Sequence, residues 1–334
     1  MANQPDVISI GDIVTDVFIK LEDDQAKVYA DSEEKRWLAM PFGTKLPYDT
    51  VQTIKGVGNA ANAAVAFARL GLDSAYVANV GDDQAGREMI DELHTNQVDT
   101  RFVRINPGKI SNIHYVLRYQ VERTILIKHE AYDYHWPHLR PDEVPKWLYF
   151  SSISGNAMSY HDQVADWLDE HTEVKLAFQP GTFQMDAGVE RLKRIYQRSE
   201  VIIVNREEAA FITGGNHDDY HDLLGRFHNM GVKIAVITDG PNGAVASDQT
   251  QILKMPLYPD PAPPLERTGA GDAFAATFVA ALIKGNNLAG ALQWAPINSM
   301  SVVQQVGAQA GLLSESQIEQ YLSNAPDNYR PEAF

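Results

Sequence analysis

Residues 201–238 read VIIVNREEAAFITGGNHDDYHDLLGRFHNMGVKIAVIT. An apolar run, Val201–Val204, opens this stretch, helical spacing follows at 206–213 and 218–230, and a second apolar run, Ile234–Thr238, closes it. Strands that alternate with helices predict an α/β fold, in which a mostly parallel sheet is covered by helices on both faces. The same alternation upstream predicts strands at Trp147–Phe150 and Val174–Phe178 and helices around 158–170 and 186–198.

The N-terminal part of the chain adds a strand, a helix and a second strand. Val7–Ile10 is a short apolar run that ends in Gly11 and Asp12. Alanine-rich helical spacing runs from Gly58 to Gly71, and Ala75–Val80 predicts the next strand.

Two polar segments with strand-like patterns, 15–55 and 101–136, interrupt this body. In the second segment, alternating apolar residues predict two strands between 111 and 129, with a turn near Glu122–Arg123. We expect the two segments to meet as a small β-sheet. Since ligands of open α/β sheets bind at the carboxyl ends of the strands, this small sheet would be a lid over that edge. The predicted division is an α/β body of residues 1–14, 56–100 and 137–334 and a discontinuous lid of residues 15–55 and 101–136.

Composition restricts the partners. The 334 residues include 28 Lys and Arg against 44 Asp and Glu, a formal net charge of −16. Such a surface repels nucleic acid and anionic membranes, so we expect neither as a partner. No apolar run approaches the roughly 20 residues of a membrane-spanning helix, and the start, MANQPDVISIGD, has no basic or cleavable apolar segment. The chain has no cysteine, which excludes disulfides and is compatible with the cytoplasmic location that we expect.

The strongest local motif is TGAGDAF at residues 268–274, followed by helical spacing to Lys284–Gly285. Its glycines permit a tight loop whose backbone N–H groups face outward where the helix begins. Such amides bind anions, here the charge of a phosphoryl group in transfer, and Asp272 in the first turn would reach a hydroxyl as a general base. A glycine-rich cap with an acidic residue that complements the helix dipole explains the same residues without a ligand. Taken alone, the motif leaves both interpretations open.

A second glycine-rich stretch, GVGNAAN at 56–62, leads into the helix that ends near Gly71. It matches the dinucleotide-binding pattern G-x-G-x-x-[GA], but that pattern belongs in the turn after the first strand, much earlier in the chain. Gly58 and Asn62 suit the close approach of a ligand with many hydroxyl groups at least as well. Asp12 and Asp16 offer carboxylates to such hydroxyls, or they are solvated loop residues.

Two more segments follow predicted strands. Asn205 and Glu208 come directly after Val201–Val204, where an amide and a carboxylate can hold Mg²⁺ through water. The same pair has the spacing of a helix capping box, and both roles are compatible. The turn TDGPNG, 238–243, has glycines that leave room for a nucleotide but that also suit a β-turn without a ligand.

Other patterns are uninformative or absent. His129, His135 and His138 have no helical frame and no third ligand at a fixed spacing, so they do not favour a metal site. The chain has neither the GxxxxGK[ST] pattern of P-loop nucleotidases nor the GxSxG pattern of many hydrolases.

Taken in order, these segments resemble the ribokinase family of carbohydrate kinases, also called the PfkB family. The resemblance covers nearly the whole chain: VISIGD, GVGNAANAAVAFARLGLDSAYVANVGDDQAG (56–86), NREE, TDGPNG, ERTGAGDAFAATF (266–278) and a late helix at Asn298–Gly307. Residues 56–86 and 266–278 look like the two signatures of the family, in the right order and separation.

The resemblance implies a Rossmann-like αβα sandwich with a β-sheet lid, which uses ATP and Mg²⁺ to phosphorylate a small sugar or sugar acid. By position, Asp272 corresponds to the base, and the amides of Gly269, Ala270 and Gly271 to the anion hole. Asn205 and Glu208 correspond to the Mg²⁺–phosphate pair. The remaining correspondences are Thr238, Gly240, Gly243 and Asn298 for the nucleotide and Asp16, Gly58 and Asn62, with Asp12 nearby, for the substrate hydroxyls. A homodimer through the lid is the assembly that we expect.

Two positions depart from the family pattern. Val57 stands where a second glycine is usual, and Glu266-Arg267-Thr268 replaces the usual acidic-Thr-Thr. Glu266 is the candidate for the monovalent-cation site of part of the family. Arg267 is a candidate for extra positive charge near the phosphates.

Three alternatives are open. Five aromatic residues suit stacking on a nucleobase, which keeps a nucleoside kinase of the same family open as the second candidate. Their use in the lid's own core or in a dimer contact is the interpretation that we prefer. A ligand-binding protein that kept the fold is disfavoured by the intact TGAGD, and an NAD-dependent oxidoreductase by the misplaced fingerprint. The aromatic residues are Tyr115, Tyr119, Tyr132, Tyr134 and Trp136.

Overall fold

The computed structural model describes residues 4–31, 35–120 and 122–334. Over these residues, ten strands form one large sheet in the order β16-β15-β14-β13-β12-β11-β10-β1-β6-β7. Neighbours from β7 to β13 pair in parallel, and the edge from β13 to β16 is antiparallel, so the prediction of a mostly parallel sheet is confirmed. The strands are β1 (Val7–Ile10), β6 (Ser74–Gly81), β7 (Val103–Asn106), β10 (Trp147–Phe150), β11 (Lys175–Phe178), β12 (Ser199–Asn205), β13 (Ile234–Thr238), β14 (Ala244–Ser247), β15 (Ile252–Met255) and β16 (Glu332–Ala333).

Helices cover both faces of this sheet. Because the parallel strands are buried on both sides, their side chains alternate between two hydrophobic cores. Val201 and Ile203 pack in the core under one group of helices, whereas Ile202 and Val204 pack in the other. The first group is α1 (Asn59–Arg69), α2 (Gln84–Thr95), α8 (Ala270–Ile283), α9 (Leu288–Val302) and α10 (Glu315–Ser323). The second is α3 (Met158–Glu170), α4 (Thr182–Ala187), α5 (Lys193–Arg198), α6 (Arg206–Thr213) and α7 (Tyr220–Asn229). Among the described residues, no helix is both long and apolar enough to cross a bilayer.

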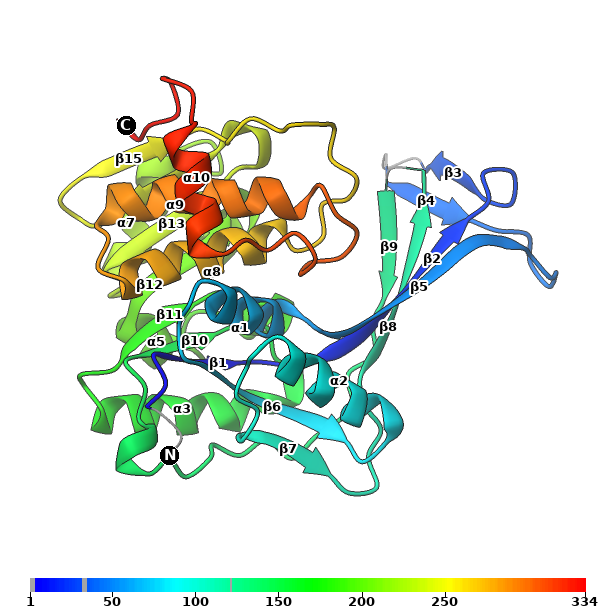
Figure 1. Cartoon of the computed structure of the whole chain (residues 1–334), viewed down its shortest axis with the longest axis horizontal. Coiled ribbons are helices and arrows are strands. Elements are labelled where there is room, and N and C mark those ends of the chain that lie inside the picture. The colour runs from blue at the N-terminus through cyan, green and yellow to red at the C-terminus, as the bar shows by residue number, and fades with distance from the viewer. Residues whose placement is uncertain (1–3, 32–34, 121) are drawn as a thin grey trace.

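A separate sheet has the order β5-β2-β8-β9 and stands beside this body (Figure 1). Its strands are β2 (Val14–Leu21), β5 (Tyr48–Val57), β8 (Ile113–Tyr119) and β9 (Glu122–Leu126), and we call them the second sheet. The two polar segments meet where β2 pairs in parallel with β8, which sets Asp16 opposite His114. A hairpin of β3 (Lys27–Ala30) and β4 (Arg36–Ala39) completes this part of the molecule.

The structure differs from the sequence predictions in four local respects. The helix predicted at 186–198 is split into α4 and α5, because Gly188 has a φ of 81°. The late helix is α9, which begins after the cap residue Asn287 and ends at Val302 rather than spanning 298–307. Glu122 and Arg123 lie in β9, so the turn before that strand precedes them. Finally, β7 pairs with β6, so part of the segment 101–136 belongs to the large sheet.

Candidate active site

A cavity of about 500 Å³ lies between the second sheet and the carboxyl ends of the parallel strands. It collects residues that are far apart in the sequence: Asp16 and His114 from the second sheet, Asn205 at the end of β12, and the loop that precedes α8. Ten of the predicted site residues line it, namely Asp12, Asp16, Gly58, Asn62, Asn205, Glu208, Thr238, Gly269, Gly271 and Asp272.

Asp272 lies in the first turn of α8 and is buried, with 8% of its surface exposed. Three side-chain amides donate hydrogen bonds to its carboxylate. Asn59 and Gln179 donate to Oδ1 at 2.9 and 3.2 Å, and Asn62 donates to Oδ2 at 2.8 Å. Both carboxylate oxygens are therefore held in place at the cavity wall.

Burial raises the pKa of Asp272, and the hydrogen bonds from Asn62, Gln179 and Asn59 oppose that rise. A raised pKa makes the carboxylate a stronger base than a solvated aspartate. The amide donors favour its charged form, which is the form that can accept a proton.

The loop before α8 leaves the N–H groups of Gly269 and Gly271 without a hydrogen-bond partner among the described residues, whereas the Ala270 N–H donates to the Arg267 carbonyl at 3.5 Å. The cap residue, Gly269, has a φ of 80° and offers no side-chain acceptor to the first-turn N–H groups. A Cβ on Gly269 would stand 2.3 Å from the Cβ of Ala308, whereas a Cβ on Gly271 would meet no atom within 4 Å. Glycine at 269 thus permits the loop conformation, and the space beside Gly271 is open to a ligand. The amides and the positive end of the helix dipole make this space an anion site.

Asn205 and Glu208 form the predicted capping box at the start of α6. The Asn205 side chain accepts from the Glu208 N–H at 2.8 Å, and Glu208 Oε2 accepts from the Asn205 N–H at 2.9 Å. Burial raises the pKa of Glu208, and the nearby charges of Asp272 and Glu207 raise it further. Both residues also line the cavity, so the cap sets an amide and a carboxylate at its wall.

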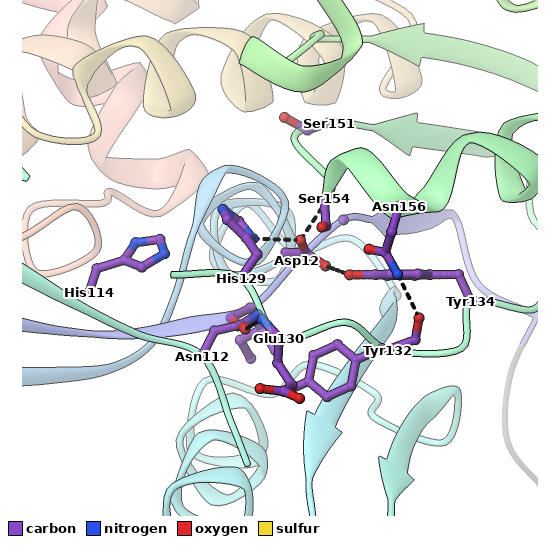
Figure 2. Close-up of polar contacts among 12 residues, drawn as sticks. Asp12, Asn112, His114, His129, Glu130, Tyr132, Tyr134, Ser151, Ser154 and Asn156 are labelled. Atoms are coloured by element: carbon purple, nitrogen blue, oxygen red, sulfur yellow. Dashed lines mark hydrogen bonds and ion pairs between the residues drawn. The ribbon is translucent and has the colours of Figure 1, made fainter. Parts of the chain in front are cut away.

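The substrate side of the cavity contains an aspartate–histidine cluster (Figure 2). Asp12 Oδ1 accepts from the Tyr134 hydroxyl at 2.7 Å, and Oδ2 accepts from the Ser154 N–H at 2.8 Å. His129 Nδ1 lies 3.0 Å from the same Oδ2. Both oxygens of Asp12 thus have protein donors, and Asp12 also lines the cavity, so its role toward ligand hydroxyls stays a prediction.

Asp16 faces the cavity from β2. Burial, with the charge of Glu266 second, raises the pKa of Asp16 to about 6. His114 Nδ1 lies 3.6 Å from Asp16 Oδ1, and burial lowers the pKa of His114 to about 4. Asp16 Oδ1 and His114 Nε2 are buried and have no hydrogen-bond partner among the described residues.

The sequence pattern of the pfkB family of carbohydrate kinases matches residues 48–315. The chain belongs to this family. It is 29% identical over 275 residues to the probable fructokinase-7 of Arabidopsis thaliana, over 73% of this chain and 78% of that protein. It is 30% identical over 241 residues to a fructokinase of Klebsiella pneumoniae (67% and 76% covered) and 27% identical over 286 residues to the ribokinase of Bacillus subtilis (81% and 89% covered). The protein is thus an ATP-dependent carbohydrate kinase.

Solved structures agree on the fold. An Arabidopsis thaliana ribokinase in complex with ribose and ATP matches with a TM-score of 0.78 at 20% identity, over 96% of this chain and 99% of that one. A nucleoside kinase of Methanocaldococcus jannaschii matches with a TM-score of 0.73 at 16% identity, over 97% and 100%. The kinase therefore has the ribokinase-like fold expected from its sequence.

Several predicted nucleotide-binding residues of the kinase have structural roles. Asn298 is fully buried; its amide donates to Thr277 Oγ1 at 2.7 Å, and its oxygen accepts from the Leu313 N–H at 2.9 Å. It does not line the cavity, so the expected nucleotide contact of Asn298 is not supported. Gly240 and Gly243 belong to the turn after β13 and also lie outside the cavity lining. At Gly243, a Cβ would stand 2.1 Å from the Met255 carbonyl oxygen, which explains this glycine without a ligand.

The aromatic residues proposed to stack on a nucleobase are engaged elsewhere. Tyr132 and Tyr134 are buried, and their hydroxyls bond to the Ile110 carbonyl and to Asp12. Trp136 packs on Trp167, with ring centroids 5.2 Å apart. None of the five lines the cavity, which removes the observation that favoured a nucleoside kinase.

Sequence reasoning missed three amides of the site. Gln179 directly follows β11, and the hydroxyls of Tyr149 and Ser151 donate to its oxygen, which directs its NH₂ group to Asp272. Gln179 could have been predicted as a site residue from its position directly after a strand. Asn59 lies inside the quoted GVGNAAN stretch. Gln309 donates to Asn62 Oδ1 at 3.0 Å, and no local pattern marks it.

Glu266 and Arg267 differ in their surroundings. Glu266 Oε2 accepts from the Gly307 N–H at 3.1 Å, whereas its buried Oε1 has no hydrogen-bond partner in the described part of the chain. Arg267 is exposed and lines the cavity.

Proposed function

We propose that this kinase transfers the γ-phosphoryl group of ATP to a hydroxyl of a small sugar or sugar acid, with Asp272 as the general base. The observation that carries the proposal is the buried Asp272 carboxylate, which three side-chain amides hold beside the unbonded N–H groups of Gly269 and Gly271 at the start of α8. A base and an anion site side by side are what phosphoryl transfer to a hydroxyl requires.

In this mechanism Asp272 accepts the proton of the substrate hydroxyl as that oxygen forms its bond to the γ-phosphorus. The bond from the γ-phosphorus to the bridging oxygen breaks, and ADP leaves with the electron pair. The N–H groups of Gly269, Ala270 and Gly271 stabilise the negative charge on the transferred group. Positioning and charge stabilisation supply most of the catalysis in such reactions.

Asn205 and Glu208 are the residues that we propose for Mg²⁺. Their capping bonds occupy Asn205 Oδ1 once and Glu208 Oε2, so Glu208 Oε1 is available for water molecules of the ion. Mg²⁺ keeps most of its water ligands in proteins, which suits this indirect binding. When bound, the ion would neutralise phosphate charge. Thr238 and the turn with Gly240 and Gly243 would face the nucleotide.

The unpaired Glu266 Oε1 is the atom that we propose for a monovalent cation. Arg267, exposed at the cavity, is the alternative source of positive charge near the phosphates. The dependence of kcat on K⁺ distinguishes them: activation by K⁺ supports Glu266, and K⁺-independent turnover supports Arg267.

The second sheet is proposed to act as a lid over the substrate, with 15–55 and most of 101–136 as its segments. We further propose a homodimer formed through this sheet, and a cytoplasmic location, where ATP is available.

The test is an ATP-consumption screen over pentoses, hexoses, keto-deoxy sugar acids and nucleosides, repeated with Asp272→Asn. We expect turnover with a sugar or sugar acid, and a fall in kcat of about 100- to 10 000-fold in the variant with ATP binding retained. Asp91→Asn, at an exposed position of α2, is the matched control and should behave as wild type. Near-normal turnover in Asp272→Asn would falsify the mechanism. Turnover with nucleosides alone would replace the substrate class.

A further inference from the structure

His129 lies in the segment that leads from β9 back to the body, and its ring fills the space between two other side chains. Its ring centroid is 5.4 Å from that of His114 and 5.4 Å from that of Phe183, both in edge-to-face arrangements. In Figure 2 the ring lies between Asp12 and His114. These contacts, together with the 3.0 Å contact to Asp12, fix the plane of the imidazole.

Asp12 determines which nitrogen of His129 carries a proton. Its carboxylate is 5% exposed and also accepts from the Tyr134 hydroxyl and the Ser154 N–H, so it is both immobile and an acceptor toward His129. A carboxylate oxygen at 3.0 Å from Nδ1 requires that Nδ1 carry the proton. Nε2 of the neutral ring is then an acceptor.

His129 Nε2 has no hydrogen-bond partner among the described residues, and His129 lines the cavity. Two further polar atoms without partners lie close by, Asp16 Oδ1 and His114 Nε2. This end of the cavity is therefore rich in unpaired acceptor atoms.

The charge of this end favours a neutral ligand group. Within the described residues, the ion-pair partners of Asp12 and Asp16 are histidines, not Lys or Arg. Arg123, on the cavity face of β9, and Arg267 line the same cavity, but neither forms an ion pair with Asp12 or Asp16 among the described residues. The two carboxylates therefore disfavour an anionic group directly beside them. A hydroxyl donates to a carboxylate or imidazole acceptor at no such cost.

We propose that His129 Nε2 accepts a hydrogen bond from one non-reacting hydroxyl of the sugar. Asp12 is the positioning residue that holds the ring in the orientation and tautomer needed for this contact. The inference rests on the proposed function, because it assigns a specificity-determining contact within the same site. It predicts that the substrate group beside His129 is an uncharged hydroxyl.

The test compares His129→Ala with wild type on the sugar that wild type turns over best in the screen, and on its single-deoxy analogues. We expect kcat/KM for that sugar to fall about tenfold or more, mainly through KM, since uniform binding is lost. One deoxy analogue should be a poor substrate for wild type but no poorer than the parent sugar for His129→Ala. His135→Ala is the matched control, because His135 is exposed and pairs only with Asp133 among the described residues.

The role of Asp12 is tested by Asp12→Asn, whose amide offers a donor to Nδ1 and so disfavours the required tautomer. We expect Asp12→Asn to raise KM as His129→Ala does, with no further loss in the double variant. ¹⁵N spectra of wild type should show His129 protonated at Nδ1. Tyr134→Phe is the second variant if Asp12→Asn does not fold, and it should weaken binding of the same hydroxyl.

The results distinguish a failure of the proposed function from a failure of the roles assigned to His129 and Asp12. Absence of turnover with any sugar by wild type overturns the proposed function. Turnover by wild type with an unchanged KM in His129→Ala, or equal sensitivity of both proteins to every deoxy analogue, overturns only the role of His129. An unshifted KM in a folded Asp12→Asn or Tyr134→Phe overturns the positioning role.

Discussion

At the scale of the residue, Asp16 is a buried carboxylate that the fold makes costly to ionise. Its side chain is 16% exposed, Oδ1 has no hydrogen-bond partner in the described structure, and Glu266 adds a like charge. These surroundings raise its pKa from 3.8 to about 6, a difference worth roughly 3 kcal/mol. A substrate hydroxyl that donates to Asp16 Oδ1 would compensate part of this cost.

The raised pKa of Asp16 predicts the sign of a pH effect on stability. The folded state keeps the proton up to about pH 6, whereas the unfolded chain releases it near 3.8, so the stabilisation is present at low pH and lost as the pH rises through 6. Between pH 7.5 and 5.5 wild type should gain about 1 kcal/mol in the free energy of unfolding relative to Asp16→Asn. Urea unfolding of both proteins at the two pH values measures this. An equal pH response in the two proteins would show that the pKa of Asp16 is ordinary.

At the scale of the element, the N-terminus of α8 contains two glycines with different reasons to be glycine. Gly269 has a positive φ, and a Cβ there would collide with Ala308. Gly271 lies inside the helix, and a Cβ there meets no atom. Gly269 is therefore required by the backbone conformation of the loop, whereas glycine at 271 leaves the anion site open.

Alanine at these two positions should therefore separate stability from activity. Gly269→Ala should lower the free energy of unfolding by about 1–3 kcal/mol, because it adds a strained φ and a core clash. Gly271→Ala should be as stable as wild type or up to about 1 kcal/mol more stable, since alanine is the better helix former. The methyl group that Gly271→Ala adds would, however, enter the anion site that we propose for the transferred phosphoryl group, so kcat of this variant should fall at least tenfold. Thermal unfolding and steady-state kinetics on the same samples check both; a Gly271→Ala enzyme with wild-type kcat would remove the anion site from this place.

Elements with a strong local pattern could be predicted from the sequence. The parallel strands appear as short apolar runs, and α6 follows its capping box. The antiparallel edge β14–β16 was not predicted, because AVAS and ILKM each contain a polar residue and β16 has only two residues, so none is a continuous apolar run. The split between α4 and α5 depends on the backbone at Gly188, although the glycine itself was visible.

The site could be predicted only where its residues are close in sequence or follow a strand. Asp272, Asn62 and the pair Asn205–Glu208 belong to short motifs that fold as units. The hydrogen bond from the Tyr134 hydroxyl to Asp12 joins residues 122 positions apart, so it depends on how the segment after β9 returns to the body. The burial of Asn298 against Leu313 is likewise a tertiary contact without a local signal.

At the scale of the whole molecule, the second sheet has two chemically different faces. Register places His114 and Ile125 on the face toward the cavity. On the other face, Tyr115 is paired with Leu126 and neighbours Val17. The two central rows of this outer face contain Thr53 and Thr124 and six apolar residues, namely Val17, Ile19, Val51, Tyr115, Leu117 and Leu126.

This outer face is the surface through which we expect the homodimer to form. Val51, Tyr115 and Leu126 are 52%, 46% and 51% exposed in the single chain. Apolar surface of this kind gains free energy when it is covered. A chain with a net charge of −16 repels its own copies, so a second copy docks best through a surface with few acidic residues. The central rows of this face contain none, and Glu122, paired with Tyr119, lies at one end of the face.

Tyr115→Glu should therefore convert the dimer into a monomer, because two copies of the new carboxylate would be buried against apolar side chains. Light scattering after size-exclusion chromatography, at tens of micromolar protein, measures the mass. Ile105→Glu is the matched control: Ile105 is 47% exposed on β7, at the edge of the large sheet, and its variant should remain dimeric.

Since Tyr115 points away from the cavity, the monomeric variant also tests whether the lid needs a partner. An unchanged kcat with a raised KM for sugar would mean that dimerisation only holds the second sheet over the substrate. A monomeric wild-type protein, or dissociation by Ile105→Glu alone, would contradict the assignment of the interface to this face.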